Sequence, residues 1–187
     1  MSFFGPKTLE IRIWGDPVLR RKADPIPTAP DPELAKLAKA MVATMRSADG
    51  VGLAAPQIGK SIRFVVLEVP MPDNGPSSPG EALLLPMMPL ALINPEIVPI
   101  TTGGLDTAEE GCLSVPKLYA KVQRPSKVIL KALTLSGERL DIECGGFLAR
   151  AIQHEIDHLD GVLFPDRLDK AEFERVKDNL NALEGKK

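Results

Sequence analysis

The sequence is 187 residues long, with 23 Lys and Arg against 25 Asp and Glu, so its formal net charge is only −2. This length suits a single domain, residues 1–187, and the balanced charge without a Lys/Arg-rich run argues against direct DNA binding. The longest apolar stretches, such as residues 82–93, are too short and too interrupted by proline to span a bilayer, so no membrane insertion is expected.

The N-terminal residues 1–14 carry charges and lack the apolar core of a secretory signal. We therefore expect a cytoplasmic protein. Its two cysteines, Cys112 and Cys144, are expected to be thiols rather than a disulfide. Cys144 is interpreted as a small structural residue of the core.

Residues 32–48 are predicted to form the first helix, because Asp31 can cap it, Pro32 suits its first turn and Gly50 follows its end. The next element is a buried strand over residues 63–69, indicated by an unbroken apolar run. The apolar stripe that should pack the helix on the core consists of Leu34, Leu37, Ala38, Met41, Val42 and Met45.

Eight prolines between residues 70 and 99 punctuate the middle of the chain. Residues 70–80 are predicted to be an extended surface loop, since polar turn-forming residues accompany the prolines there. A strand is expected at 91–94, with 97–100 continuing it after a break at Pro95.

In the last third of the chain, apolar and polar residues first alternate, as in strands, and then follow the spacing of helices. Residues 127–135 and 140–144 are predicted to form a hairpin, followed by a mostly buried helix over 147–159 and a C-terminal helix over 170–183 capped by Asp169. This order predicts an α+β fold, with antiparallel β-sheets packed around a central buried helix and a helical C-terminus.

The only two histidines, His154 and His158, stand four residues apart on the predicted buried helix, with Glu155 next to the first. An i, i+4 pair projects from one face of a helix, so both rings can bind one metal ion. Glu155 lies about 100° further round the helix and can reach a water on the metal without being a ligand.

A catalytic metal site of this kind needs a third protein ligand. Cys112 is one candidate, because it lies in a glycine-assisted segment, residues 109–116, where a short side chain can be aimed at a site. The small-residue segment 50–59 could let a substrate backbone approach closely. Downstream carboxylates remain as alternative ligands: Asp160, Asp166, Asp169, Glu172 and Glu174.

Three segments in this order, residues 50–59, 110–114 and 153–158, resemble the three motifs of the peptide deformylase family. The resemblance covers roughly residues 9–169 of the chain. It implies removal of the formyl group from N-formylmethionyl nascent peptides, with release of formate. Two flanking segments, 15–20 and 161–164, also look like the family.

Carried over to this sequence, the resemblance implies that Cys112, His154 and His158 bind one divalent metal ion. Glu155 would be the general base and acid. Gln57 and the backbone N–H of Leu113 would stabilise the oxyanion. The residues expected to bind substrate are Val51, Gly52, Glu110, Gly111, Phe147 and Ala151.

The resemblance implies Fe²⁺ in the cell, whereas isolated protein could carry Zn²⁺, Ni²⁺ or Co²⁺, because a Cys-His-His set accepts all of them. It also suggests ribosome association through the C-terminal helix. Tyr119 stands where many bacterial members have an arginine that helps to position the peptide. Two other functions stay open: a metallopeptidase with the same histidine motif and a ligand other than Cys112, or a non-enzymatic binding module stabilised by its metal.

Overall fold

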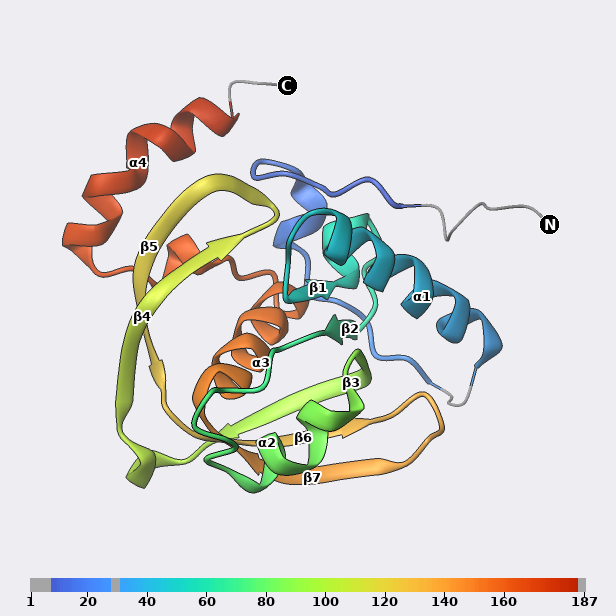
Figure 1. Ribbon diagram of the computed structural model, residues 1–187. Helices are drawn as coiled ribbons and strands as arrows, with labels where there is room; N and C mark the ends of the chain where they lie inside the picture. The colour runs from blue at the N-terminus through green and yellow to red at the C-terminus, as the bar shows by residue number, and fades with distance from the viewer. Residues whose placement is uncertain (1–7, 28–30, 185–187) are drawn as a thin grey trace.

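The computed structural model describes residues 8–27 and 31–184. A helix, α3 (Gly146–Leu159), lies between a five-stranded antiparallel sheet and a long two-stranded ribbon (Figure 1). This arrangement is the expected α+β fold with a central buried helix. Eleven of the fourteen residues of α3 are buried, so its histidines enter the interior on a rigid element.

The five-stranded sheet has the order β1-β2-β3-β6-β7. The predicted strand is β2, and the predicted hairpin is the β6–β7 pair. β3 runs through Pro95 as one strand, with a register shift between Ile93 and Glu96 that accommodates the proline. The bounds are β1 (Gly52–Ala54), β2 (Phe64–Leu67), β3 (Leu90–Pro99), β6 (Val128–Leu133) and β7 (Arg139–Cys144).

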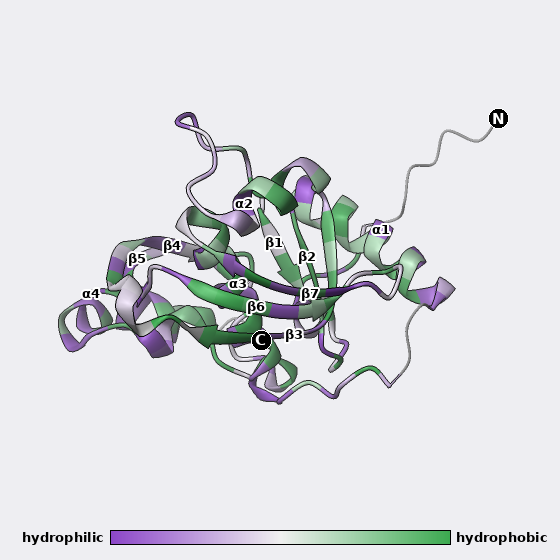
Figure 2. Cartoon of the chain, turned by 90° about the horizontal axis from the view of Figure 1, so that it is seen from below, coloured by the Kyte–Doolittle hydropathy of each residue, from purple (hydrophilic) through white to green (hydrophobic). Residues whose placement is uncertain are grey.

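Both faces of β2 are covered, which explains its unbroken apolar run. Val65 and Leu67 belong to the core formed with α3, whereas Phe64 and Val66 belong to the core formed with α1 (Pro32–Ser47). Successive side chains of a strand point to opposite faces, so each face of β2 receives every second residue. Figure 2 shows that β1 and β2 are coloured mainly as hydrophobic.

The two-stranded ribbon joins β4 (Leu105–Cys112) to β5 (Val115–Pro125). The sequence indicated only a glycine-assisted segment at residues 109–116, so this ribbon was not predicted. β4 is largely polar and exposed, and it therefore lacks the apolar alternation that marks a half-buried strand. The burial of β5 does alternate, from Leu118 to Arg124, and the matching alternation of apolar and polar residues from Leu118 to Gln123 was a usable signal.

The helices α1 and α4 begin directly after the aspartates predicted to cap them. Asp31 accepts a hydrogen bond from the Glu33 N–H at 2.8 Å at the start of α1, and Asp169 accepts one from the Glu172 N–H at 2.9 Å at the start of α4 (Lys170–Glu184). Both helices confirm the predicted spans. Short 3-10 turns lie at Pro17–Arg20, Ala55–Ile58, Leu85–Met87, Thr101–Gly103 and Phe164–Arg167.

The expected surface loop is present over most of its length, but it ends two residues earlier than expected. Residues 70–78 are irregular, and α2 (Pro79–Leu84) begins directly after them. Ser78 caps α2, and its hydroxyl also accepts a hydrogen bond from the Gly145 N–H at 2.9 Å, just before α3. The segment is therefore tied to the start of the helix that carries the histidines.

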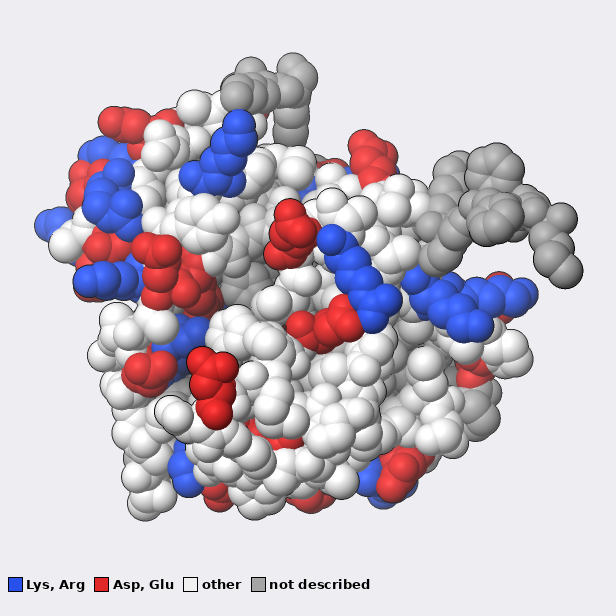
Figure 3. Space-filling model, viewed as in Figure 1, with Lys and Arg blue, Asp and Glu red and all other residues white. Residues whose placement is uncertain are grey.

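α4 closes the far side of the β4–β5 ribbon. Val176 and Leu180 are buried against apolar residues of β5, and the outer face of α4 is hydrophilic (Figure 2). Lys and Arg alternate with Asp and Glu over this helix (Figure 3). Within the described ranges, 8–27 and 31–184, no helix has the length and apolar character needed to cross a membrane.

Candidate metal centre and active site

Cys112, His154 and His158 meet beside α3. One potential ligand atom from each lies within 4.8 Å of the others, and Cys112 Sγ is 3.2 Å from His158 Nε2. Around a tetrahedral ion with bonds of about 2.3 Å to sulfur and about 2.0 Å to nitrogen, such atoms would be about 3.3–3.6 Å apart. The three side chains therefore lie close enough together that they could hold one metal ion.

Among the described residues, the group of potential ligand atoms that contains both histidines has Cys112 as its third member and none of the downstream carboxylates, which have other partners. Asp160 pairs with Arg63 and Asp166 with Arg20, while Asp169 caps α4. The two glutamates pair within α4, Glu172 with Arg175 and Glu174 with Lys177.

The turn of the backbone at the end of β4 positions the thiol of Cys112. The β4–β5 register shifts between Gly111 and Cys112, where the ribbon turns tightly so that Cys112 pairs with Val115. The Ser114 N–H donates to Cys112 Sγ at 3.4 Å across this turn. This hydrogen bond helps to hold the sulfur in place, and cysteine binds metal as the thiolate. Cys112 and Cys144 are both free, as predicted.

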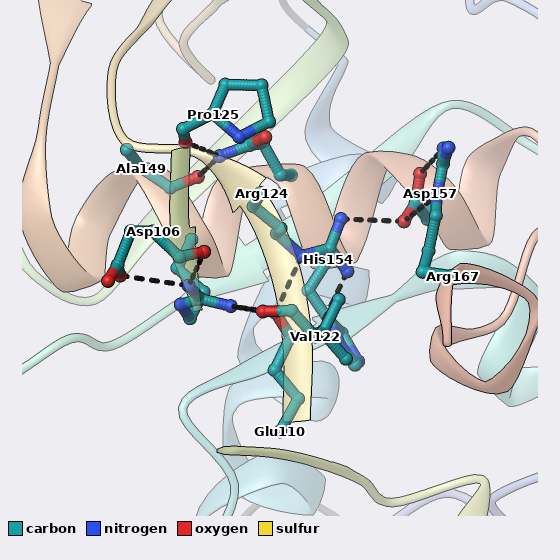
Figure 4. A network of polar contacts seen from close by, with 11 residues as sticks. Asp106, Glu110, Val122, Arg124, Pro125, Ala149, His154, Asp157 and Arg167 are labelled. Carbon is teal, nitrogen blue, oxygen red and sulfur yellow. Dashed lines mark hydrogen bonds and ion pairs between the residues drawn. The ribbon is translucent and has the colours of Figure 1, made fainter. Parts of the chain in front are cut away.

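Glu110 fixes the orientation of His154 (Figure 4). Burial would raise the pKa of Glu110, but hydrogen bonds from His154 and Arg124 outweigh it and hold that pKa well below its ordinary value. An ionised carboxylate only accepts, so His154 Nδ1 must donate its proton to Glu110 Oε2, 3.0 Å away. Nε2 is then the His154 nitrogen that could bind a metal, which would take the place of a proton there.

Two buried arginines, which sequence reasoning missed, hold Glu110 in place. Arg124 donates to both carboxylate oxygens, from Nε at 2.6 Å and from Nη2 at 2.9 Å, and Arg150 Nη1 donates to Oε1 at 2.7 Å. Arg124 also bonds to Asp157 on α3 (Figure 4). The usable signal was an arginine, Arg150, inside a helix predicted to be mostly buried.

Glu155 is 4% exposed, and burial raises its pKa to about 7. Its Oε2 and His158 Nδ1 are the buried side-chain N and O atoms without a hydrogen-bond partner in the part of the chain that the structure describes. Burial, followed by nearby positive groups, lowers the pKa of His158 well below its ordinary value, so the ring is neutral as a ligand must be.

Gly52 faces the Glu155 carboxylate from β1. A Cβ at position 52 would lie only 2.2 Å from Glu155 Oε1. The absence of a side chain at Gly52 is thus what makes room for the carboxylate beside β1.

Gln57 is 1% exposed and firmly held. Its Oε1 accepts from the Ala54 N–H at 2.8 Å, which leaves its Nε2 to donate to Ser114 Oγ at 3.1 Å and toward Cys112 Sγ at 3.6 Å. The amide N–H₂ therefore points into the region of the ligand set.

A cavity of about 590 Å³ opens in front of these groups. Tyr119 is 59% exposed, and its ring covers Gly111, where a Cβ would lie 2.5 Å from the tyrosine Cε1. Gln57, Cys112, Leu113, His154 and Glu155 all line the cavity. So do the six residues expected to bind substrate: Val51, Gly52, Glu110, Gly111, Phe147 and Ala151.

Comparison with known proteins identifies the family. The sequence model of the family described as "Polypeptide deformylase" matches residues 8–174. A peptide deformylase of Halothermothrix orenii is 50% identical over 160 residues, which is 86% of this chain and 93% of that protein.

Solved structures agree with the sequence match. A crystal structure of peptide deformylase from Thermotoga maritima superposes with a TM-score of 0.74 at 42% identity, covering 87% of this chain and 99% of that one. A plant peptide deformylase superposes with a TM-score of 0.80 at 36% identity, covering 100% of this chain and 93% of that one. The chain therefore belongs to the polypeptide deformylase family, metal-dependent enzymes that remove the N-formyl group from nascent peptides.

Proposed function

We propose that Cys112, His154 and His158 hold one divalent metal ion, and that Glu155 is the general base and acid of deformylation in this chain. The observation that carries the proposal is the convergence of the three ligand atoms within 4.8 Å, beside a buried carboxylate oxygen without a partner. The donor set fits a metal: one thiol held by N–H donors, one ring oriented by Glu110 and one neutral ring.

When bound, the metal supplies Lewis-acid polarisation and makes a water nucleophilic near neutral pH. Glu155 then has two tasks. It accepts a proton from the water that attacks the formyl carbon, and it delivers a proton to the amide nitrogen as the C–N bond breaks. Formate and a free N-terminal amine are the products. A carboxyl group with a pKa near 7 is suited to both transfers.

Gln57 and the Leu113 N–H are proposed to stabilise the oxyanion that forms on the formyl oxygen. The hydrogen bond from Ala54 fixes the Gln57 amide before substrate binds, so its N–H₂ needs no reorganisation during the reaction. Val51, Phe147 and Ala151 are proposed to hold the methionine side chain, with Gly52, Glu110 and Gly111 beside the peptide.

Replacing Gln57 with leucine should lower kcat roughly 10²- to 10³-fold, about 3 kcal/mol of transition-state stabilisation, with a smaller effect on KM. The Ala54 N–H also loses its acceptor, so we expect a modest fall in the thermal unfolding temperature. Steady-state kinetics and calorimetry on folded, metal-loaded protein check both effects. A kcat within threefold of the unmodified chain would contradict the assigned role.

Fe²⁺ is proposed as the metal in the cell, where the protein acts in the cytoplasm on N-formylmethionyl nascent chains. Zn²⁺, Ni²⁺ or Co²⁺ is expected in isolated protein. Thiolate and imidazole ligands suit all four ions, so metal availability decides among them.

The direct test is formate release from formyl-Met-Ala-Ser by protein purified without oxygen and loaded with Fe²⁺ or Ni²⁺. Metal-stripped protein and the Cys112→Ala variant are the controls, and both should be inactive. Formate release without metal, or wild-type metal content in Cys112→Ala, would contradict the proposed site. Cleavage of internal amide bonds in unformylated peptides would instead support the metallopeptidase alternative, and a metal-loaded protein without either activity would support a binding module.

Ribosome association is proposed through the exposed face of α4. The basic residues proposed for this contact are Lys170, Arg175 and Lys177 on the helix, together with Lys186 and Lys187, which lie outside the described residues. Because Val176 and Leu180 are buried against β5, deleting the helix would also expose core. A more specific test replaces Lys170 and Lys177 with glutamate, which should reduce co-sedimentation of the protein with ribosomes. Co-sedimentation of the unmodified protein should also weaken as the salt concentration is raised.

A further inference from the structure

Arg150 lies on α3, one turn before His154, and it lines the cavity although it is only 6% exposed. Its Nη1 donates to Glu110 Oε1 at 2.7 Å and to the Val122 carbonyl at 3.0 Å. Its Nη2 donates to the carbonyl and the carboxylate of Asp106, both at 2.9 Å. The two terminal nitrogens are thus committed to the β4–β5 ribbon.

This pattern determines which part of Arg150 can face the cavity. With Nη1 and Nη2 bonded to β4 and β5, the methylene stem and Nε remain for the cavity side. Arginine often covers an apolar surface with its stem while its charged end is satisfied elsewhere. Ala151, the next residue of α3, and Phe147, one turn earlier, line the same cavity, so the stem continues an apolar wall.

The other end of Arg150 acts on Glu110. Each Glu110 oxygen accepts two hydrogen bonds: Oε1 from Arg124 and Arg150, and Oε2 from Arg124 and His154. Four donors match the acceptor capacity of a carboxylate, so its plane is fixed. Without Arg150, Arg124 could still bind Glu110. Among the described residues, however, Arg150 is the only arginine of α3 whose guanidinium contacts the Glu110 carboxylate. Its loss would therefore remove the guanidinium contact between Glu110 and the helix that carries His154.

We propose that Arg150 is a positioning residue that joins the wall of the substrate side-chain pocket to the orientation of His154 through Glu110. The proposal rests on the metal site proposed above. It predicts that one substitution disturbs two properties together, metal retention and selection for methionine. A residue that only filled the core would lower stability without moving these two properties in parallel.

Arg150→Met tests this, because methionine keeps an unbranched stem and removes every donor. The matched control is Arg139→Met, at an exposed arginine of β7. With Co²⁺ bound, we expect Arg150→Met to lose the ion to a chelator roughly 10- to 100-fold faster, with altered Co²⁺ absorption bands. The ratio of kcat/KM for formyl-Met-Ala-Ser over formyl-Ala-Ala-Ser should fall by about tenfold.

Arg150→Lys provides a second measurement in case the methionine variant does not fold. Lysine keeps the charge but cannot hold Glu110 and Asp106 with one planar group, so we expect the same two changes at smaller size. Wild-type Co²⁺ retention and selectivity in either folded variant, or equal changes in Arg139→Met, would overturn the proposal. Failure of the metal site itself would look different, because Co²⁺ binding would then be unaffected by Cys112→Ala.

Discussion

Replacing Glu155 with alanine is expected to lower kcat by roughly 10²- to 10⁴-fold while the protein keeps its metal, the range typical of losing a general acid–base group. The ligand atoms come from Cys112, His154 and His158, so the ion does not depend on the glutamate. Removal of the proton carrier affects both the attack of water and the departure of the amine. Because both steps are transition-state events, KM should change much less than kcat.

The same substitution should not destabilise the fold. Glu155 Oε2 is buried without a hydrogen-bond partner, which is unfavourable for folding, so alanine removes an unsatisfied polar atom together with some packing. An activity loss with an unchanged or higher unfolding temperature would mark a functional residue that is held at a cost in stability.

Formate release, metal analysis and calorimetry on the same Glu155→Ala preparation measure these effects. Glu174→Ala, on the exposed face of α4, is a control for loss of a surface glutamate. Turnover within fivefold of the unmodified chain would exclude Glu155 as the general base. Loss of the metal would instead show that Glu155 supports the ligand set.

The parts of the fold that local chemistry determines could be predicted from the sequence. α1 and α4 begin at the aspartates expected to cap them, and α3 is buried as its broad apolar surface indicated. The β4–β5 ribbon was not predicted, because its polar outer strand is stabilised by pairing with β5 and not by a buried face. Pairing partners are a tertiary property that local propensity does not encode.

The residues of the site also divide into those that local spacing brings together and those that only the fold brings together. Four-residue spacing alone brings His154 and His158 to one helix face, whereas spacing leaves Cys112 as one of several candidate ligands and only the family resemblance singles it out. The hydrogen bonds that hold Glu110, here called the clamp, come from Arg124, fourteen residues away, and from Arg150, forty residues away. No spacing rule relates residues on different elements at such separations, so only the folded chain reveals the clamp.

Replacing Gly52 with alanine is expected to lower kcat/KM by about 10²-fold, the scale of loss when a catalytic group is displaced by about 1 Å. The new methyl group would lie 2.2 Å from Glu155 Oε1 and 2.7 Å from its Cδ. Since Gly52 is buried in β1 and pairs with Leu67, the strand has little freedom to retreat, and the carboxylate must move. Metal content should stay unchanged.

A double-mutant cycle separates displacement of Glu155 from damage to peptide binding. Aspartate at position 155 is one methylene shorter, so it removes the Oε1 and Cδ contacts of the new methyl group at 2.2 Å and 2.7 Å and leaves only the Cγ contact at 2.9 Å. Glu155→Asp should therefore cost much less activity in the Gly52→Ala background than in the unmodified chain. Gly103→Ala, where a Cβ would meet only side-chain atoms at 3.1 Å or more, controls for a generic glycine effect. Strict additivity of the two changes would show that Gly52 serves the peptide and not the carboxylate, whereas strong coupling would mean that this glycine sets the position of the catalytic base.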